Sequence, residues 1–90
     1  MKISIIVNPV SGTDAARKRA KKVVLALEEE FNIKGINTER AGHATELARQ
    51  DVNDGVEIVV AVGGDGTVNE IASALVGTET ALIIVGTGSG

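Results

Sequence analysis

Residues 63–67 read Gly-Gly-Asp-Gly-Thr and follow directly on the apolar run Ile-Val-Val-Ala-Val of residues 58–62. A short apolar run that is rich in β-branched residues predicts a buried strand. The next residues carry apolar side chains at helical spacing, at positions 68, 71, 72 and 75. This part of the chain therefore predicts a strand, a glycine turn and the start of a helix.

The glycine turn has the composition of an anion-binding loop. Its three glycines leave the backbone uncovered by β-carbons, and the following helix start offers free N–H groups and the positive end of its dipole. That combination favours a phosphate group. Asp65 adds a carboxylate, which suits a site where a magnesium ion or a reacting hydroxyl is also bound. The simpler alternative is a tight turn in which Asp65 caps the helix.

Length and composition argue against several classes of protein, among them disulfide-rich, nucleic-acid-binding and membrane-spanning proteins. The chain has 90 residues, which is enough for one small domain, and no cysteine for a disulfide framework or a thiolate metal site. Its net charge of −3 gives no overall basic field, so we expect no nucleic-acid partner. We find no signal peptide and no run long enough to span a membrane. Together with the absence of cysteine, this predicts a cytoplasmic protein.

Strand and helix patterns alternate along the chain. Apolar runs predict strands at residues 3–7, 36–38, 57–62 and 80–85, and helical periodicity predicts helices at residues 14–31, 43–50 and 68–75. The alternation predicts a three-layer α/β fold, with a parallel sheet of four strands and helices on both faces. Right-handed crossovers favour the strand order 2-1-3-4. Ligands of such sheets bind where the strand order reverses, so residues 8–12 and 63–67 should meet there.

The loop of residues 8–12, Asn-Pro-Val-Ser-Gly, ends the first strand with a proline and a glycine. Thr13 or Asp14 can cap the helix that follows. The basic residues of this helix come first and its acidic residues last, which is the reverse of what the helix dipole favours. Arg17 and Lys18 are therefore the side chains best placed to face a phosphate, and the other charges form a solvated face.

Three segments of the chain carry a family resemblance. They read Asn-Pro-Val-Ser-Gly at residues 8–12, Gly-His-Ala-Thr-Glu-Leu-Ala at residues 42–48 and Gly-Gly-Asp-Gly-Thr-Val-Asn-Glu at residues 63–70. Together they resemble the N-terminal lobe of the diacylglycerol kinase catalytic domain family, which includes sphingosine, ceramide and bacterial lipid kinases. The resemblance covers essentially the whole chain. It implies a lobe of the kind that NAD kinases and phosphofructokinases also have.

The resemblance implies an activity and a role for each matched residue. It implies that ATP and Mg²⁺ are bound and that the γ-phosphate is transferred to a lipid hydroxyl such as that of diacylglycerol. Asp65 would be the catalytic residue and the magnesium ligand. Because the chain has no Walker lysine, backbone amides and the metal would hold the phosphates. The implied nucleotide contacts are Asn8, Ser11, Gly12, Thr38, Gly63, Gly64, Asp65, Gly66, Thr67, Val68, Asn69 and Ser89.

The resemblance also implies what this chain lacks. In the family a second, β-rich domain follows and carries the general base, part of the metal site and the lipid pocket. Residues 1–90 would then be the N-terminal ATP-binding lobe, and we expect no lipid turnover by this piece alone. The lipid acceptor would bind through the second domain, with peripheral membrane contact. An exposed edge on the fourth strand would allow a homodimer.

Two other functions agree with the same residues. An NAD kinase or sugar kinase lobe uses the same acidic glycine loop, but it leaves residues 8–12 without an assigned role. A non-catalytic nucleotide-binding or interaction module of flavodoxin-like topology needs no chemistry at all. His43 reads as a polar helix-start residue, although the resemblance implies that it orders a loop near the nucleotide. Asn69 and Glu70 either cap the third helix or face solvent in its first turn, and Thr67 is a natural N-cap for that helix.

Overall fold

The computed structural model describes residues 1–88, which form a four-stranded sheet and three helices. The strands are β1 (Ile3–Val7), β2 (Ile36–Asn37), β3 (Ile58–Gly63) and β4 (Ala81–Gly86), and the helices are α1 (Asp14–Phe31), α2 (His43–Asn53) and α3 (Asp65–Leu75). The strand order is β2-β1-β3-β4, and every neighbouring pair is parallel. The predicted α/β fold and its 2-1-3-4 order are confirmed.

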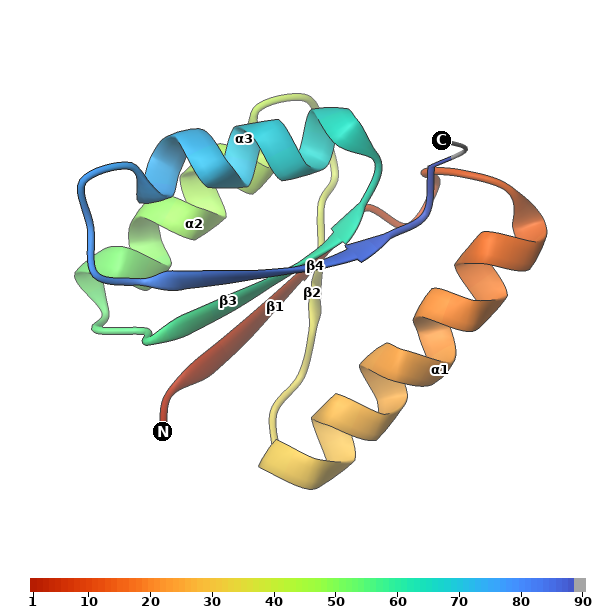
Figure 1. Ribbon diagram of the computed structural model, residues 1–90, viewed down its shortest axis with the longest axis horizontal. Helices are drawn as coiled ribbons and strands as arrows, with labels where there is room; N and C mark the ends of the chain where they lie inside the picture. The colour runs from red at the N-terminus through yellow and green to blue at the C-terminus, as the bar shows by residue number, and fades with distance from the viewer. Residues whose placement is uncertain (89–90) are drawn as a thin grey trace.

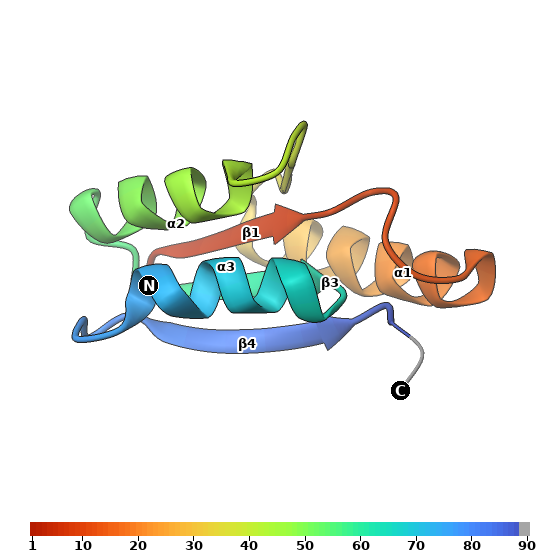
Figure 2. The ribbon, with the colours of Figure 1, turned by 90° about the horizontal axis from the view of Figure 1, so that it is seen from above.

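Helices cover both faces of the sheet, with α1 on one face and α2 and α3 on the other (Figures 1 and 2). Alternate residues of each strand point to opposite faces, and this divides the core in two. Ile6 and Ala61 pack with α2 and α3. Ile5 and Val60 pack with α1. The central strands β1 and β3 are therefore apolar on both faces, as expected for buried parallel strands.

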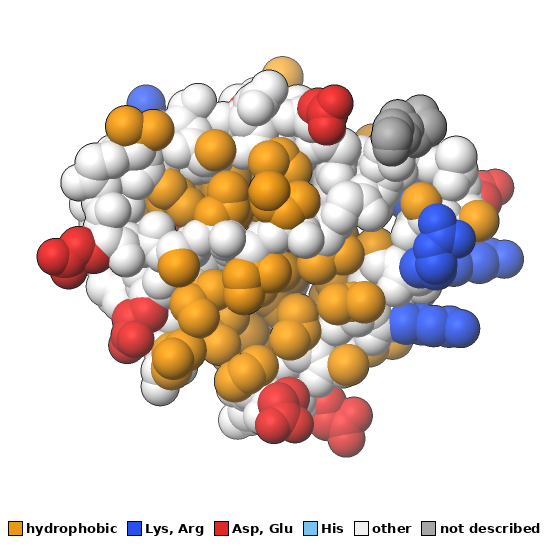
Figure 3. Space-filling model, in the orientation of Figure 1, with side chains coloured by type: hydrophobic (Ala, Val, Ile, Leu, Met, Phe, Trp, Pro, Cys, Tyr) orange, Lys and Arg blue, Asp and Glu red, His pale blue; other side chains and the backbone are white. Residues whose placement is uncertain are grey.

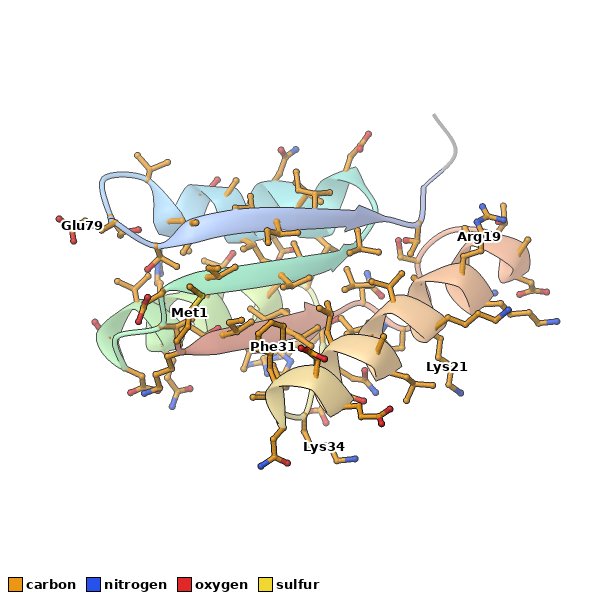
Figure 4. The ribbon with its side chains drawn as sticks, turned by 60° about the horizontal axis from the view of Figure 1, so that its bottom comes forward. Met1, Arg19, Lys21, Phe31, Lys34 and Glu79 are labelled. Atoms are coloured by element: carbon orange, nitrogen blue, oxygen red, sulfur yellow. The ribbon has the colours of Figure 1, made fainter. Side chains whose placement is uncertain are left out.

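The face of the sheet under α1 is incompletely covered. Three residues of α1 are buried: Ala16, Ala20 and Val24. Val23 and Phe31, which follow Ala20 and Leu27 at helical spacing, are 42% and 43% exposed, and Ile83 of β4 is 49% exposed. Hydrophobic side chains accordingly gather at the surface on this side (Figure 3), where Phe31 projects from the last turn of α1 (Figure 4). The apolar residues of α1 are thus only partly covered by the sheet.

Helix α3 begins earlier than the sequence pattern predicts. Only Gly64 separates the end of β3 from the first residue of α3, Asp65. Gly64 is the N-cap and makes no side-chain capping bond, so the predictions that Thr67 or Asp65 caps this helix are wrong. Glycine and aspartate read as a loop by propensity, but here the helix reaches directly to the strand. Thr67 consequently lies inside the first turn and is buried.

The other boundaries agree within a few residues. Thr13 is the N-cap of α1, where its hydroxyl accepts a hydrogen bond of 3.1 Å from the N–H of Ala16. Helix α2 continues to Asn53, three residues beyond the predicted end at Gln50. Within residues 1–88, no helix is both long enough and apolar enough to cross a membrane.

Candidate functional site

The carboxyl ends of β1, β3 and β4 lie at one edge of the sheet, and the loops that follow them start in register. The N–H of Asn8 donates to the carbonyl of Val62 at 2.8 Å. The N–H of Thr87 donates to the carbonyl of Gly63 at 3.0 Å. The ladder of the sheet therefore continues for one residue into each loop and fixes where the loop begins.

Asn8 joins the loop after β1 to helix α3. Its Nδ2 donates to the hydroxyl of Thr67 at 3.1 Å, and its Oδ1 accepts from the N–H of Val10 at 3.2 Å. Thr67 is only 6% exposed, and the bond is partly buried. The two loops that the topology predicts to meet do lie together: the Nδ2 of Asn8 joins them, and its Oδ1 orders its own loop.

The loop after β4 closes the other side of the site. The hydroxyl of Thr87 donates to Ser11 Oγ at 2.9 Å, and Thr87 is 1% exposed. Gly12 has φ +80°, and a β-carbon there would overlap the carbonyl of Thr87. A β-carbon on Gly64 would lie 3.0 Å from Ser11 Oγ. Backbone thus approaches backbone at Gly12, which requires glycine there, whereas the close neighbour of Gly64 is a side-chain hydroxyl.

Thr87 was not among the predicted site residues. The available signal was its place between two glycines in the last loop, Gly86-Thr87-Gly88. The prediction there fell on Ser89, which lies outside the described residues.

The first turn of α3 provides free donors for an anion. The first hydrogen bond within α3 runs from the N–H of Val68 to the carbonyl of Gly64, at 3.0 Å. The N–H groups of residues 65–67 precede this bond, so they have no acceptor inside the helix. Asp65 and Gly66 are exposed, and the turn is open to solvent there. This is the arrangement that binds phosphate at a helix N-terminus.

Asp65 places one exposed carboxylate on the same turn. No group of three or more His, Cys, Asp or Glu within residues 1–88 could hold a metal ion by itself. Mg²⁺ is commonly bound by one or two carboxylates, with substrate phosphates and water completing its shell. The donors present fit that pattern only when a phosphate ligand contributes to it.

A pocket of about 370 Å³ opens beside this turn, on the α2 and α3 side of the sheet. Its lining residues are Asn8, Val10, Thr38, Glu39, Arg40, Ala41, Ala44, Thr67 and Glu70. Three predicted residues, Asn8, Thr38 and Thr67, therefore share one cavity. Its size suits a small-molecule ligand.

The segment between β2 and α2 forms the outer wall of this pocket. The N–H of Thr38 donates to the carbonyl of Val7 at 2.8 Å, which continues the sheet. The N–H of Glu39 donates to His43 Nδ1 at 2.9 Å. Arg40 forms an ion pair with Glu46 of α2. His43 therefore binds the backbone of this wall, and its implied role near the nucleotide stays a prediction.

Glu70 is the residue of this pocket whose role the sequence left open. Its Oε1 is buried and has no hydrogen-bond partner within the described residues. Its backbone carbonyl accepts from the hydroxyl of Thr45 at 3.2 Å, which fixes α3 against α2. A buried acceptor without a donor is costly, so natural structures usually satisfy it. The signal in the sequence was its spacing of three from Thr67, which puts both side chains on one helix face.

The remaining predicted residues are placed as follows. Val68 is partly buried and packs against the core. Asn69 is exposed on α3. Arg17 donates to the carbonyl of Val10 at 3.1 Å and pairs with Asp14, so it supports the loop after β1.

The fold and the site define a parallel α/β lobe whose glycine loops surround a helix N-terminus. Residues 2–90 match the family described as "Diacylglycerol kinase catalytic domain". The chain belongs to this family, which confirms the resemblance and favours it over an NAD kinase or sugar kinase lobe.

Individual relatives agree with the family. The diacylglycerol kinase of Staphylococcus saprophyticus subsp. saprophyticus is 33% identical over 79% of this chain and 24% of its own length. That of Staphylococcus haemolyticus is 35% identical over 79% of this chain and 22% of its own length. A crystal structure of a diacylglycerol kinase from Bacillus anthracis str. Sterne has 30% identity and a TM-score of 0.80, over 97% of this chain and 33% of that chain. The chain thus spans about a quarter of the length of these curated relatives.

Proposed function

We propose that this chain is the nucleotide-binding lobe of an ATP-dependent lipid kinase. The observation that carries the proposal is the meeting of three loops around the free N–H groups of α3, through the bonds from Asn8 to Thr67 and from Thr87 to Ser11. Relatives that carry the same lobe are called diacylglycerol kinases, so a lipid hydroxyl such as that of diacylglycerol is the proposed acceptor.

The polarity of the site supports one orientation of the nucleotide. The phosphates would bind the first turn of α3, where the N–H groups are free and the helix dipole is positive. The nucleoside would occupy the pocket lined by Thr38 and Glu70. The carboxylate of Glu70 would repel a phosphate, but it can accept a hydrogen bond from a ribose hydroxyl or a base amino group. The two ends of ATP would thus be distinguished by charge.

The chemistry proposed for this lobe is positioning and charge stabilisation. Bound Mg²⁺ would neutralise the charge that develops as the γ-phosphoryl group leaves ATP. Asp65 would hold that ion from the exposed side of the turn, and the N–H groups of residues 65–67 would donate to phosphate oxygens. No residue of the lobe is assigned as the general base. We therefore propose that lipid turnover needs a second domain, in an enzyme that works in the cytoplasm and contacts the membrane peripherally.

Calorimetric titration with ATP tests the proposal. ATP should bind, Mg²⁺ should tighten the binding, and Asp65→Asn should abolish the effect of Mg²⁺. NAD titrated separately should not bind. Asp54→Asn is a matched control, because Asp54 is exposed and follows the last residue of α2, away from the loops. The proposal would be overturned if ATP bound neither to the folded lobe nor to a longer chain that contains this lobe and a second domain.

A further inference from the structure

A second pocket, of about 340 Å³, lies on the opposite face of the sheet, against α1. We call it the α1 pocket. Its walls come from α1 between Arg17 and Glu28, from the ends of β1 and β3, from Gly35 and Asn37 at β2, and from Thr87. Asn8 is the one residue that it shares with the pocket of Thr38 and Glu70. The nucleotide proposal leaves this cavity without a role.

The inner surface of the α1 pocket is aliphatic. Val7 and Val62 contribute from the strands and Val24 from the helix, and all three belong to the hydrophobic cluster on this face. Leu25 forms an outer wall and is 54% exposed. An alkyl chain bound here would leave water for apolar contacts, which is the main source of affinity for such a group.

The charges around the α1 pocket are arranged along the helix. Arg17 and Lys21 lie at its N-terminal end and Glu28 lies two turns further on, about 10 Å from Lys21 along the helix axis. Glu28 is engaged, because its Oε2 accepts from the N–H of Gly35 at 2.7 Å. Arg17 is engaged by Asp14 and by the carbonyl of Val10.

Lys21 is the cation of this pocket that is left without a partner. Within residues 1–88 the ion pairs are those of Arg17 and Arg40, and neither includes Lys21. Figure 4 shows Lys21 projecting from a different side of α1 than Arg19. The α1 pocket therefore combines an aliphatic interior with one available positive charge at its mouth.

We propose that the α1 pocket binds an aliphatic anion, meaning a short alkyl chain that carries a carboxylate or a phosphate head group. The chain lies against Val24 and Val62, and the head group faces Lys21, with Arg17 adding positive potential. Such a ligand matches both properties of the pocket, whereas a neutral alkyl compound matches only the interior. The proposal is independent of the nucleotide-binding function.

An occupant of the α1 pocket would also touch the loop after β1. Asn8 and Thr87 line the pocket, and their side chains bond Thr67 and Ser11 at the other site. Binding should therefore change the environment of the Asn8 side-chain amide. If it also changes affinity at the phosphate loops, the coupling must be equal in both directions.

NMR titration of the whole chain with octanoate and with octyl phosphate tests the proposal. Saturable shifts are expected for the methyl groups of Val7, Val24 and Val62 and for the Asn8 amide. Octanol, which lacks the charge, should bind more weakly, and acetate, which lacks the chain, should not bind. The ratio of the two octyl anions shows whether a carboxylate or a phosphate head group is preferred.

Two exposed lysines provide a matched pair of variants. Lys21→Gln should weaken binding of the octyl anions by about threefold, the effect expected for an exposed charge pair, and leave octanol unchanged. Lys22→Gln should change neither, because Lys22 does not line the pocket. Leu25→Ala should weaken both the anions and octanol.

Three results would overturn the proposal. The first is the absence of saturable shifts in a spectrum that shows a folded chain. The second is equal affinity for octanoate and octanol. The third is a set of shifts centred on Phe31 and Ile83, which would mean that the alkyl chain binds the exposed apolar surface instead of the α1 pocket.

Discussion

The side-chain amide of Asn8 donates a 3.1 Å hydrogen bond to the hydroxyl of Thr67, across 59 residues of sequence. This bond joins the loop after β1 to the first turn of α3, and Thr67 is buried where it is made. The distance between the two loops, and so the width of the proposed phosphate site, depends on this partly buried contact.

Removing this bond should cost stability and ligand affinity together. Thr67→Val keeps the shape of the side chain and leaves the amide of Asn8 without an acceptor, so we expect a loss of about 1 kcal/mol in the free energy of unfolding. Asn8→Ala should cost a similar amount, and the double variant should cost clearly less than the sum. Urea unfolding of the three variants measures the coupling. Strictly additive losses would show that the bond does not join the loops in solution.

Gly12→Ala should be far more disruptive than an alanine at another glycine of similar backbone geometry. Gly12 and Gly77 have similar φ values of +80° and +76°. A β-carbon at Gly12 would overlap the carbonyl of Thr87, whereas a β-carbon at Gly77 would have no other atom within 4 Å. Gly77→Ala should cost about 1 kcal/mol, from the left-handed backbone alone. Gly12→Ala should cost at least about 2 kcal/mol more, because the loop must move away from β4.

Thermal or urea unfolding of the two glycine variants measures this difference directly. Equal losses for Gly12→Ala and Gly77→Ala would contradict the close approach of the two loops. A fold that survives Gly12→Ala should still bind ATP more weakly, since the loop of residues 8–12 is displaced.

Most of the fold could be predicted because local and global signals agree in it. The β-branched runs that form β1 and β3 are apolar on both faces, and that pattern occurs when helices cover a parallel sheet on both sides. Handedness then left few strand orders to consider. The same argument predicts that residues 8–12 and 63–67 lie together at one edge of the sheet.

The parts that could not be predicted depend on distances across the fold. Propensity places Asp65 and Gly66 in a loop, whereas the glycines before them let α3 start directly at the strand. Thr87 enters the site only because β4 ends beside β3. Glu70 stands out only once its carboxylate oxygen is known to be buried and without a donor.

Glu70→Gln should reduce the affinity for ATP without affecting affinity for tripolyphosphate. The carboxylate of Glu70 lines the pocket proposed for the nucleoside, and hydrogen bonds to a charged acceptor are stronger than those to a neutral amide. A loss of about 1 kcal/mol corresponds to about a fivefold weaker binding of ATP. Tripolyphosphate carries no nucleoside, so its affinity should not fall.

Calorimetry with both ligands tests the role of Glu70. Glu57→Gln is the control, because Glu57 is exposed and precedes β3 at the opposite edge of the sheet. An equal loss for ATP and tripolyphosphate would mean that Glu70 acts on the phosphate loop, and the proposed orientation of the nucleotide would then be wrong.

Asp51 of α2 should make the stability of the fold depend on pH. Burial raises the pKa of its carboxyl above the ordinary value, and the nearby charge of Asp54 adds to this, while a hydrogen bond from Ser4 and the charge of Lys2 oppose it. Asp51 Oδ2 is buried without a partner in the described part of the chain. A carboxyl whose pKa is higher in the folded state destabilises that state when it ionises.

The sign of the effect follows from this pKa. Below the ordinary pKa of an aspartate, Asp51 is protonated in both states and costs nothing. As pH rises from there through the raised folded-state pKa, the parent chain loses stability, and above that pKa the loss is constant.

Asp51→Asn removes this titration. The free energy of unfolding of the variant, relative to that of the parent, should therefore increase as pH rises from the ordinary pKa to the folded-state pKa of Asp51. Asp54→Asn should narrow this pH range, because it removes one cause of the raised pKa. Urea unfolding at several values between about pH 3 and pH 7 measures the difference, and a difference that is flat or falls with rising pH would show that Asp51 is not held in a desolvated position.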